Sequence, residues 1–353
     1  MKSITDAIKE IVDIGRIEHK KTVFLIGNTI KVESGEFYLT PTRNYGQVVL
    51  SGAIVYSEKV AKKIAMEIDG LIDYIFVDAE KKISDNNSIS GEPGNIERAV
   101  KEVVKKSSLI SYKSNDLTVD AADAFISEYF SKDLVGVGGR KVAIIGAGNI
   151  GSKLSQKLVE RGANVFLNRR NKEKLDLIVN QINATKSIYT IAKAFSSASP
   201  IEACSGADIV IGASDGIPVI DSSIIDMLSA ESLLIDIGKG SIEKKAIKKA
   251  SLRSIEVYRL SVESALEGMV VSLISTHDVL NLRTGRGLYH KLQIVSGGLL
   301  AHKNEIVVDD YRNPKLIYGI GNGEGDFIRS PEKEIKDKLK ILKILISNER
   351  KKK

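Results

Sequence analysis

The sequence has no tryptophan, one cysteine and six prolines among 353 residues, and aromatic residues make up 5% of it. A single cysteine, Cys204, excludes an internal disulfide framework, so stability must come from a packed apolar core. No run approaches the roughly 20 apolar residues of a membrane-spanning helix, and the first residues lack a signal-peptide core. We therefore expect a cytoplasmic protein with no membrane partner. Cys204 sits in a helical stretch before a buried strand, which favours a packed thiol over a nucleophile.

Charge and composition limit the classes of ligand. Lys and Arg number 52 against 45 Asp and Glu, a net charge of +7, and part of the excess lies in residues 349–353. Because aromatic stacking platforms are few, we expect no nucleic-acid partner. No grouping of His, Cys, Asp and Glu has metal-ligand spacing, so we predict no metal site. A chain of this length is expected to form about two domains.

The segment 141–151 carries the strongest functional signal in the sequence. Residues 142–145 form a short apolar run that suits a strand buried on both faces of a parallel sheet. Gly146 then permits a tight turn, Gly148 lets the backbone approach a pyrophosphate, and Gly151 lets the next helix pack against the strand. The amides at the start of that helix, at Asn149 and Ile150, would meet the phosphates. This order predicts a dinucleotide site.

The residues after the next predicted strand, 164–167, indicate which dinucleotide binds. An NAD site usually has Asp or Glu there to accept hydrogen bonds from the ribose hydroxyls. This chain has Asn168 followed by Arg169 and Arg170. Guanidinium groups bind a phosphate in bidentate fashion, and a carboxylate would repel it, so we predict NADP as the cofactor. The alternative is a solvated basic turn.

Two further strands end in small or polar residues that we assign to the same site. A strand is expected at residues 207–214, with Ser214 and Asp215 at its carboxyl end. Residues 233–240 repeat the pattern and include Gly238. Ligands of open parallel sheets gather at the carboxyl ends of the strands, so these residues should flank the nicotinamide ribose. The glycines could equally serve a plain turn.

The N-terminal part alternates helical and strand patterns. A helix is expected over the first 20 or so residues, strands at 22–30, 36–40, 47–54 and 74–77, and helices at 60–71 and 95–106. A further strand is expected at 109–112, and after the arginines a helix at 172–182 and a short strand at 187–189. The loop 84–94 has no apolar period and is either functional or a passive insertion.

The C-terminal region is rich in glycine beside Arg, His and Asp. Strands are expected at 306–310 and 316–318. The glycines of 285–298 and 319–325 either wrap an anionic substrate or mark tight hairpins. His277 and His290 lie in this region and are candidate acids or bases.

Residues 107–250 resemble the shikimate dehydrogenase and amino-acid-dehydrogenase-like group. The resemblance depends on the junction 114–125 before the glycine motif and on the Asn-Arg-Arg turn at 168–170. It implies a substrate domain ahead of the nucleotide domain, with a lysine and an aspartate handling the proton of the reacting hydroxyl while a hydride moves to or from NADP. By position, Asp120 fits the aspartate, and Lys82, or its neighbour Lys81, fits the lysine.

The sequence also departs from that group. The Pro-His-Lys surroundings of the group's lysine are absent, and its serine-rich carboxylate site is replaced by residues 31–35, so shikimate is not the expected substrate. A lysine in a cleft with a neighbouring carboxylate can exchange protons near neutral pH. Alternatively, Asp120 is a carboxylate at a helix N-terminus and Lys82 belongs to a solvated turn.

These observations predict an α/β protein with a Rossmann-type doubly wound parallel sheet at 130–270. A separate α/β substrate domain is expected at 1–125, with a C-terminal extension at 276–353 packing back on it. The expected function is NADP-dependent hydride transfer with a small polar hydroxy, carbonyl or imine metabolite, in a homo-oligomer. Residues 206–214 also resemble ornithine cyclodeaminase-like and methylene-folate dehydrogenase-like proteins, which leaves a lyase that retains its nucleotide as one alternative. A non-catalytic NADP sensor is another.

Overall fold

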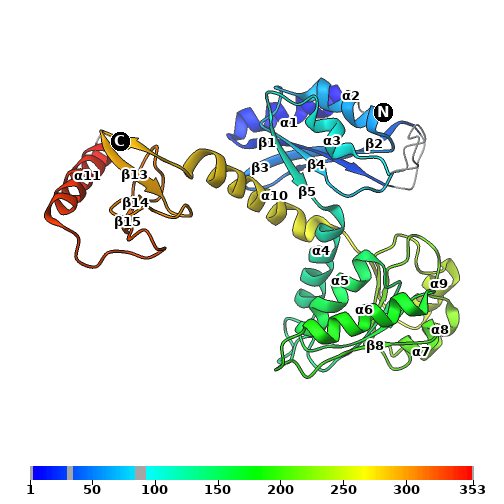
Figure 1. Cartoon of the computed structure of the whole chain (residues 1–353). Coiled ribbons are helices and arrows are strands. Elements are labelled where there is room, and N and C mark those ends of the chain that lie inside the picture. The colour runs from blue at the N-terminus through cyan, green and yellow to red at the C-terminus, as the bar shows by residue number, and fades with distance from the viewer. Residues whose placement is uncertain (1–2, 30–34, 84–92, 352–353) are drawn as a thin grey trace. The chain divides into compact units, whose positions relative to one another are not determined.

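The computed structural model describes residues 3–29, 35–83 and 93–351 (Figure 1). The chain divides into two compact units, Met1–Met269 and Val270–Lys353. The first unit contains two parallel sheets and the second contains a smaller mixed sheet.

The first sheet has five strands in the order β2-β3-β1-β4-β5, and all are parallel except β2, which runs antiparallel to β3. Its strands are β1 (Lys21–Asn28), β2 (Phe37–Asn44), β3 (Val48–Val55), β4 (Tyr74–Asp78) and β5 (Ser108–Tyr112). The helices α1 (Ile4–Glu18), α2 (Glu58–Ile68) and α3 (Ile96–Lys101) share one apolar core with this sheet. Ser3 caps the start of α1, because the Ser3 hydroxyl and the Asp6 carboxylate each accept the other residue's backbone N–H.

The second sheet has six parallel strands in the order β8-β7-β6-β9-β10-β11. They are β6 (Lys141–Ile145), β7 (Asn164–Asn168), β8 (Ala194–Ser196), β9 (Ile209–Gly212), β10 (Leu233–Asp236) and β11 (Val257–Arg259). The order reverses between β6 and β9, which is the Rossmann arrangement, and ligands of such sheets bind at the reversal point. The predicted doubly wound α/β fold is confirmed.

Helices cover both faces of this second sheet, which explains why its central strands are buried throughout. One core joins Val142 and Ile144 of β6 to α4 (Ser114–Tyr129), α5 (Asn149–Glu160) and α6 (Lys172–Thr185). The other core joins Ala143 and Ile145 to α7 (Pro200–Cys204), α8 (Ser222–Met227) and α9 (Lys244–Leu252). Alternate residues of β6 therefore point into opposite cores.

Some expected elements differ from the structure. Residues 187–189 form a turn with Ile188 and Tyr189 exposed, so the predicted strand there is wrong, and the strand that pairs with β7 is β8. Helix α3 ends at Lys101, earlier than expected. Residues 84–92 of the predicted loop and residues 31–34 of the segment in place of the serine-rich site lie outside the described part of the chain.

Helix α10 (Glu263–Asp278) begins in the first unit and ends in the second, where a π-helical turn, η1 (Val279–Arg283), follows it. The second unit has strands β12 (Arg286–Tyr289), β13 (Leu292–Ser296), β14 (Ile306–Val308) and β15 (Ile317–Ile320) in that order. Helix α11 (Lys333–Lys351) packs Leu342 and Ile346 on this sheet. Whether residues 276–353 pack on residues 1–125 stays a prediction.

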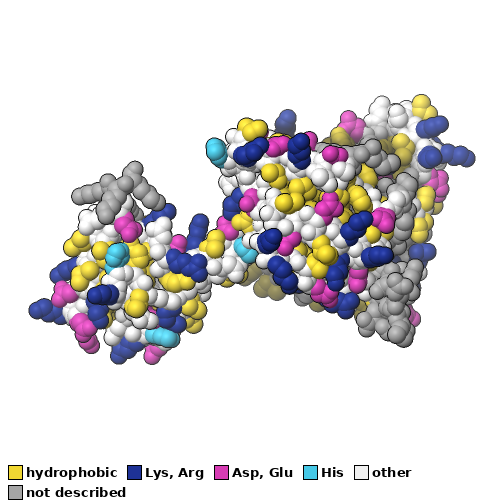
Figure 2. Space-filling model, turned by 90° about the horizontal axis from the view of Figure 1, so that it is seen from above, with side chains coloured by type: hydrophobic (Ala, Val, Ile, Leu, Met, Phe, Trp, Pro, Cys, Tyr) yellow, Lys and Arg dark blue, Asp and Glu magenta, His cyan; other side chains and the backbone are white. Residues whose placement is uncertain are grey.

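The surface carries both signs of charge. Basic and acidic side chains are interspersed on the face shown in Figure 2. None of the helices in the described residues combines the length and apolarity that crossing a membrane requires. Within the same residues, no three or more His, Cys, Asp or Glu side chains are grouped so that they could hold a metal ion.

Candidate functional site

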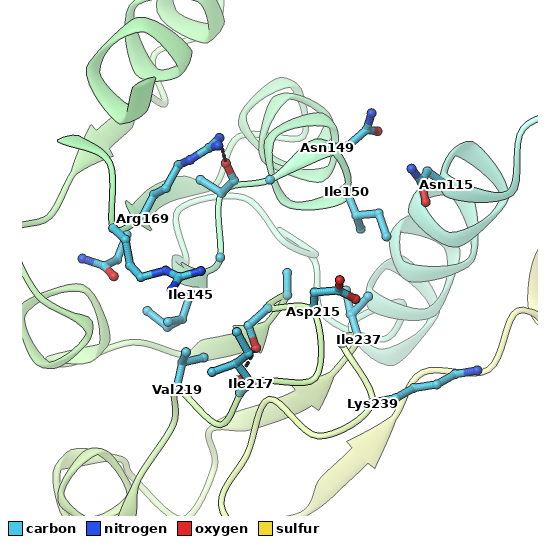
Figure 3. Close-up of a pocket in the computed structure, with 18 of the residues that line it drawn as sticks. Asn115, Ile145, Asn149, Ile150, Arg169, Asp215, Ile217, Val219, Ile237 and Lys239 are labelled. Atoms are coloured by element: carbon cyan, nitrogen blue, oxygen red, sulfur yellow. Dashed lines mark hydrogen bonds between the residues drawn. The ribbon is translucent and has the colours of Figure 1, made fainter. Parts of the chain in front are cut away.

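A pocket of about 720 Å³ lies at the carboxyl ends of the Rossmann strands (Figure 3). Loops after β6, β7, β9 and β10 supply most of its wall, and residues from the first sheet and from α4 supply the rest. Every residue that we predicted for the cofactor lines this pocket except Gly151. The residues in question are Gly146, Gly148, Asn149, Ile150, Asn168, Arg169, Arg170, Ser214, Asp215 and Gly238. Their roles in binding stay predictions.

The three glycines of the turn after β6 have different surroundings. Gly146 has φ +113°, in the region that favours glycine, and a Cβ there would lie 2.6 Å from the backbone of Ala213. A Cβ on Gly151 would lie 2.4 Å from the Gly146 carbonyl oxygen, so this glycine permits close packing of helix on strand. A Cβ on Gly148 would meet no described atom within 4 Å. The open space at Gly148 is where a ligand can approach the backbone.

Helix α5 begins at this open space. Gly148 is the residue that precedes its first turn, and no side chain caps the helix there. The first amides of a helix have no partner within the helix and carry a partial positive charge. Together with the neighbouring glycine, they form the kind of site that binds a phosphate.

The end of β7 lies against the glycine turn. The Asn168 carbonyl accepts the amides of Gly146 and Ala147 at 3.0 and 3.2 Å, and its side-chain amide donates to the Ser197 carbonyl at 3.0 Å. The Arg169 Nη1 donates to the Ala147 carbonyl at 2.8 Å, and this bond holds its guanidinium beside the turn (Figure 3). Arg170 is exposed. The pocket wall therefore has two guanidinium groups, and no carboxylate, at the end of β7.

The loops after β9 and β10 pack tightly on each other. The Ser214 hydroxyl lies 2.9 Å from the Ser241 hydroxyl and also donates to the Ile217 carbonyl. A Cβ on Gly238 would lie 1.7 Å from the Ser214 carbonyl oxygen, so the absence of a side chain there serves the packing of the two loops. Asp215 is exposed at the pocket.

Lys82 lines another part of the pocket and belongs to a polar cluster at the ends of β1 and β4 and the start of α4. The Lys82 Nζ lies 3.0 Å from the Glu80 carboxylate and 3.5 Å from the Asp78 carboxylate, and it donates to the Ser114 hydroxyl. Asp78, at the end of β4, is only 1% exposed. Its Oδ2 accepts the Ser114 hydroxyl at 2.6 Å and the Asn28 amide at 3.2 Å. The cluster thus fixes the Lys82 ammonium at the pocket.

Sequence reasoning missed most of this cluster. Asn28 ends β1, and Asn115 lies in the first turn of α4, where its backbone N–H donates to Glu80 Oε2 at 3.1 Å. Both residues line the pocket. Burial and the neighbouring carboxylates of Asp78 and Glu80 raise the pKa of Tyr112, so its phenol stays neutral. Asn28 and Asp78 are polar residues at the ends of two buried strands, and this pattern could have located the cluster from the sequence.

Asp120 is not brought together with Lys82. Helix α4 begins at Ser114, so Asp120 lies almost two turns along it and forms an ion pair with Lys157 of α5 at 3.1 Å. It lines a separate hollow of about 360 Å³. The structure thus offers Ser114, Asp78 and Glu80 as the partners of Lys82. The α4 N-terminus is at Ser114, so Asp120 is also not a carboxylate at the helix start.

The other candidate groups lie outside this pocket. Burial raises the pKa of Cys204 to about 12, which leaves an unreactive thiol. His277 lies on α10 and its Nδ1 is 3.2 Å from the Asn281 amide. His290 is 3.8 Å from Glu349 of α11.

The glycines of the second unit make room for aromatic rings. A Cβ on Gly285 would lie 2.6 Å from the Tyr311 ring, and one on Gly319 would lie 2.6 Å from the Phe327 ring. Gly297 faces the Tyr318 ring in the same way, at 2.9 Å. These positions are glycine because a side chain there would collide with a ring. Neither the anion-wrapping nor the hairpin interpretation included this packing role.

Comparison with known proteins agrees with the Rossmann assignment. Residues 141–240 match the family described as "NADP oxidoreductase coenzyme F420-dependent". No curated protein sequence matches the chain. With its glycine turn and strand order, this segment has the fold of NAD(P)-binding Rossmann domains, and the family that it matches is one of oxidoreductases.

Among solved structures, a dipicolinate synthase from Bacillus subtilis is 13% identical, with 72% of this chain and 96% of that protein's chain covered and a TM-score of 0.36. A shikimate dehydrogenase in complex with NADP+ is 13% identical over the same shares, with a TM-score of 0.39. L-tryptophan dehydrogenase from Nostoc punctiforme is 12% identical, with shares of 68% and 69% and a TM-score of 0.36.

Proposed function

We propose that this chain, which carries a nucleotide-binding domain of the NAD(P)-binding Rossmann superfamily, is an NADP-dependent oxidoreductase. Its substrate would be a small polar hydroxy, carbonyl or imine metabolite. The observation that carries the proposal is the open space at Gly148, at the start of α5 and at the reversal point of the sheet. A diphosphate would occupy this space and accept hydrogen bonds from the first amides of α5.

The end of β7 supports NADP over NAD. The Asn168 side-chain amide is engaged with the Ser197 carbonyl, and no carboxylate follows it to hold a 2′-hydroxyl. Arg169 is held beside the turn through the Ala147 carbonyl, which leaves its other N–H groups for a 2′-phosphate. Arg170 would add a second guanidinium.

Lys82 is the residue that we assign to the proton. A bound nicotinamide supplies or accepts the hydride at the reacting carbon. During reduction the Lys82 ammonium would donate a proton to the substrate oxygen or nitrogen, and during oxidation the neutral amine would take it back. The Ser114 hydroxyl accepts a hydrogen bond from Lys82 and donates one to Asp78, so it orients the ammonium. The Lys82 side chain is 21% exposed, so water would replace the proton that it gives up.

Titration of the purified protein with NADPH and with NADH tests the cofactor. We expect NADPH to bind more tightly, because only NADPH has the phosphate that the guanidinium groups recognise. Equal affinities would contradict the assignment to Arg169 and Arg170. Binding of neither nucleotide would overturn the proposed function.

A screen of hydroxy acids, oxo acids and amino acids, monitored by the absorbance of reduced nicotinamide, tests the reaction. Net formation or loss of the reduced cofactor supports an oxidoreductase. Product formation with a bound cofactor that shows no net change would instead indicate a lyase. Nucleotide binding with no product from any compound would indicate a sensor.

A further inference from the structure

Lys239 has a backbone conformation that is unusual for its residue type. It follows β10 in the turn Gly238-Lys239-Gly240 and has φ 53°, in the left-handed region that glycine adopts most easily. The turn has glycines on either side, yet the position itself is a lysine that lines the pocket. Backbone strain of this kind often marks a functional residue.

The surrounding structure holds this turn in place. Asp236 is 3% exposed, and its carboxylate accepts the Gly240 amide at 2.9 Å and the Ser241 amide at 3.1 Å. On the other side, Gly238 packs so closely on Ser214 that no side chain fits between them. The backbone at Lys239 is therefore fixed, and a glycine there would remove the strain without disturbing these bonds.

The charge of Lys239 is not used elsewhere among the described residues. Lys82 is neutralised by two carboxylates at 3.0 and 3.5 Å, and the α4 amides near it are also taken by carboxylates. Lys239 forms no ion pair within the described part of the chain and is exposed. Figure 3 shows Lys239 and Arg169 at opposite ends of the labelled residues, with Asp215 and Ile237 between them.

We infer that Lys239 anchors an anionic group of the substrate, a carboxylate or a phosphate, at the end of the pocket away from the arginines. This inference rests on the proposed function, because it assumes that the adenosine half of the cofactor binds at the end of the pocket beside Arg169 and Arg170. It narrows the substrate to a small organic anion. A lysine ammonium binds such a group as a compact point charge.

Calorimetric titration of the NADP+-saturated protein tests this subsite. The probes are oxalate for a carboxylate, inorganic phosphate for a phosphoryl group and neutral oxamide as the uncharged match of oxalate, all at constant ionic strength. Lys239→Gly removes the charge and the strain together, and Lys239→Arg keeps the charge. Lys248→Ala is the matched control, because Lys248 is exposed on α9 and does not line the pocket.

We expect oxalate or phosphate to bind the unmodified protein and to lose about tenfold or more in affinity in Lys239→Gly. Lys239→Arg and Lys248→Ala should keep most of the affinity, and oxamide should not bind. The thermal midpoint of Lys239→Gly should be equal to or higher than that of the unmodified protein. The anion whose affinity falls in Lys239→Gly identifies the group of the substrate that Lys239 binds.

The inference would be overturned by no binding of either anion to protein that binds NADP+, by equal affinity in Lys239→Gly, or by an equal loss in Lys248→Ala. A loss of NADP+ affinity in Lys239→Gly would assign the lysine to the cofactor and would also overturn it. Failure of the unmodified protein to bind NADP+ overturns the proposed function instead.

Discussion

Substitution of Gly148 and of Gly151 by alanine should separate the ligand-binding role of the turn from its packing role. At Gly148 the backbone is extended, with φ −87° and ψ −157°, and an added methyl group meets no described atom within 4 Å. Alanine fits there without a clash, and the gain from a less flexible unfolded chain is offset by the poorer fit of alanine to the position before a helix, so the free energy of unfolding should change by less than about 1 kcal/mol.

Gly151→Ala should behave in the opposite way. The new Cβ would lie 2.4 Å from the Gly146 oxygen and 3.3 Å from Ile144 Cγ2, so α5 must move away from β6. Overpacking of this kind costs about 1–3 kcal/mol, and the better helix propensity of alanine offsets up to about 1 kcal/mol of it. We expect a net loss of about 1–2 kcal/mol.

For NADPH binding, Gly148→Ala should have a larger effect than Gly151→Ala. In Gly148→Ala the methyl group would occupy the space proposed for the diphosphate. Loss of even one charge-assisted hydrogen bond, about 1.5–3 kcal/mol, lowers the NADPH affinity by about tenfold to 150-fold. The fluorescence of NADPH is excited at wavelengths that protein side chains do not absorb, so it can be followed with little protein background.

Urea unfolding followed by circular dichroism measures the first effect, and NADPH titration measures the second. If Gly148→Ala is folded and binds NADPH as the unmodified protein does, the turn does not hold a diphosphate. If Gly151→Ala has an unchanged unfolding midpoint, the packing argument is wrong.

Three other predictions concern separate parts of the first unit. Arg169→Ala with Arg170→Ala should weaken NADPH binding about tenfold or more and leave NADH unchanged in parallel titrations. Once a substrate is known, Lys82→Met should lower its turnover about 10²- to 10⁴-fold with unchanged NADPH affinity, as steady-state kinetics and titration would show. Burial raises the pKa of Asp123, but the hydrogen bonds and charge of Arg161 outweigh it and lower that pKa below 3.8. Ionised Asp123 therefore stabilises the fold above pH 3.8. In urea unfolding, Asp123→Asn should have a lower free energy of unfolding than the unmodified protein above that pH, and the difference should shrink as the pH falls below it.

The nucleotide-binding half could be predicted from the sequence because its signals are local. The β6 strand, the glycine turn and the α5 helix follow one another within residues 141–160, and each step has its own residue pattern. The false strand at 187–189 shows the limit of such patterns. Its Ser-Ile-Tyr composition suits a strand, but β8 at Ala194–Ser196 forms the pairs with β7.

The glycines of the second unit show a different limit. Gly285 and Tyr311 are far apart in the sequence, as are Gly297 and Tyr318, so nothing near each glycine indicates the ring that fills its space. A glycine that receives an aromatic ring and a glycine that approaches a ligand look the same in one sequence. The partner decides the role, and only the folded chain identifies it.

The Lys82 cluster shows why the sequence could place Lys82 near the sheet edge but could not identify the residues that contact it. The lysine lies just after a strand end, so its place near the sheet edge followed from topology alone. The partner depended on where α4 begins, because each residue along a helix turns the side chain by about 100°. Since α4 begins at Ser114, a serine faces Lys82, and Asp120 faces α5. Asp78, buried at the end of β4, then supplies the negative charge that the sequence analysis assigned to Asp120.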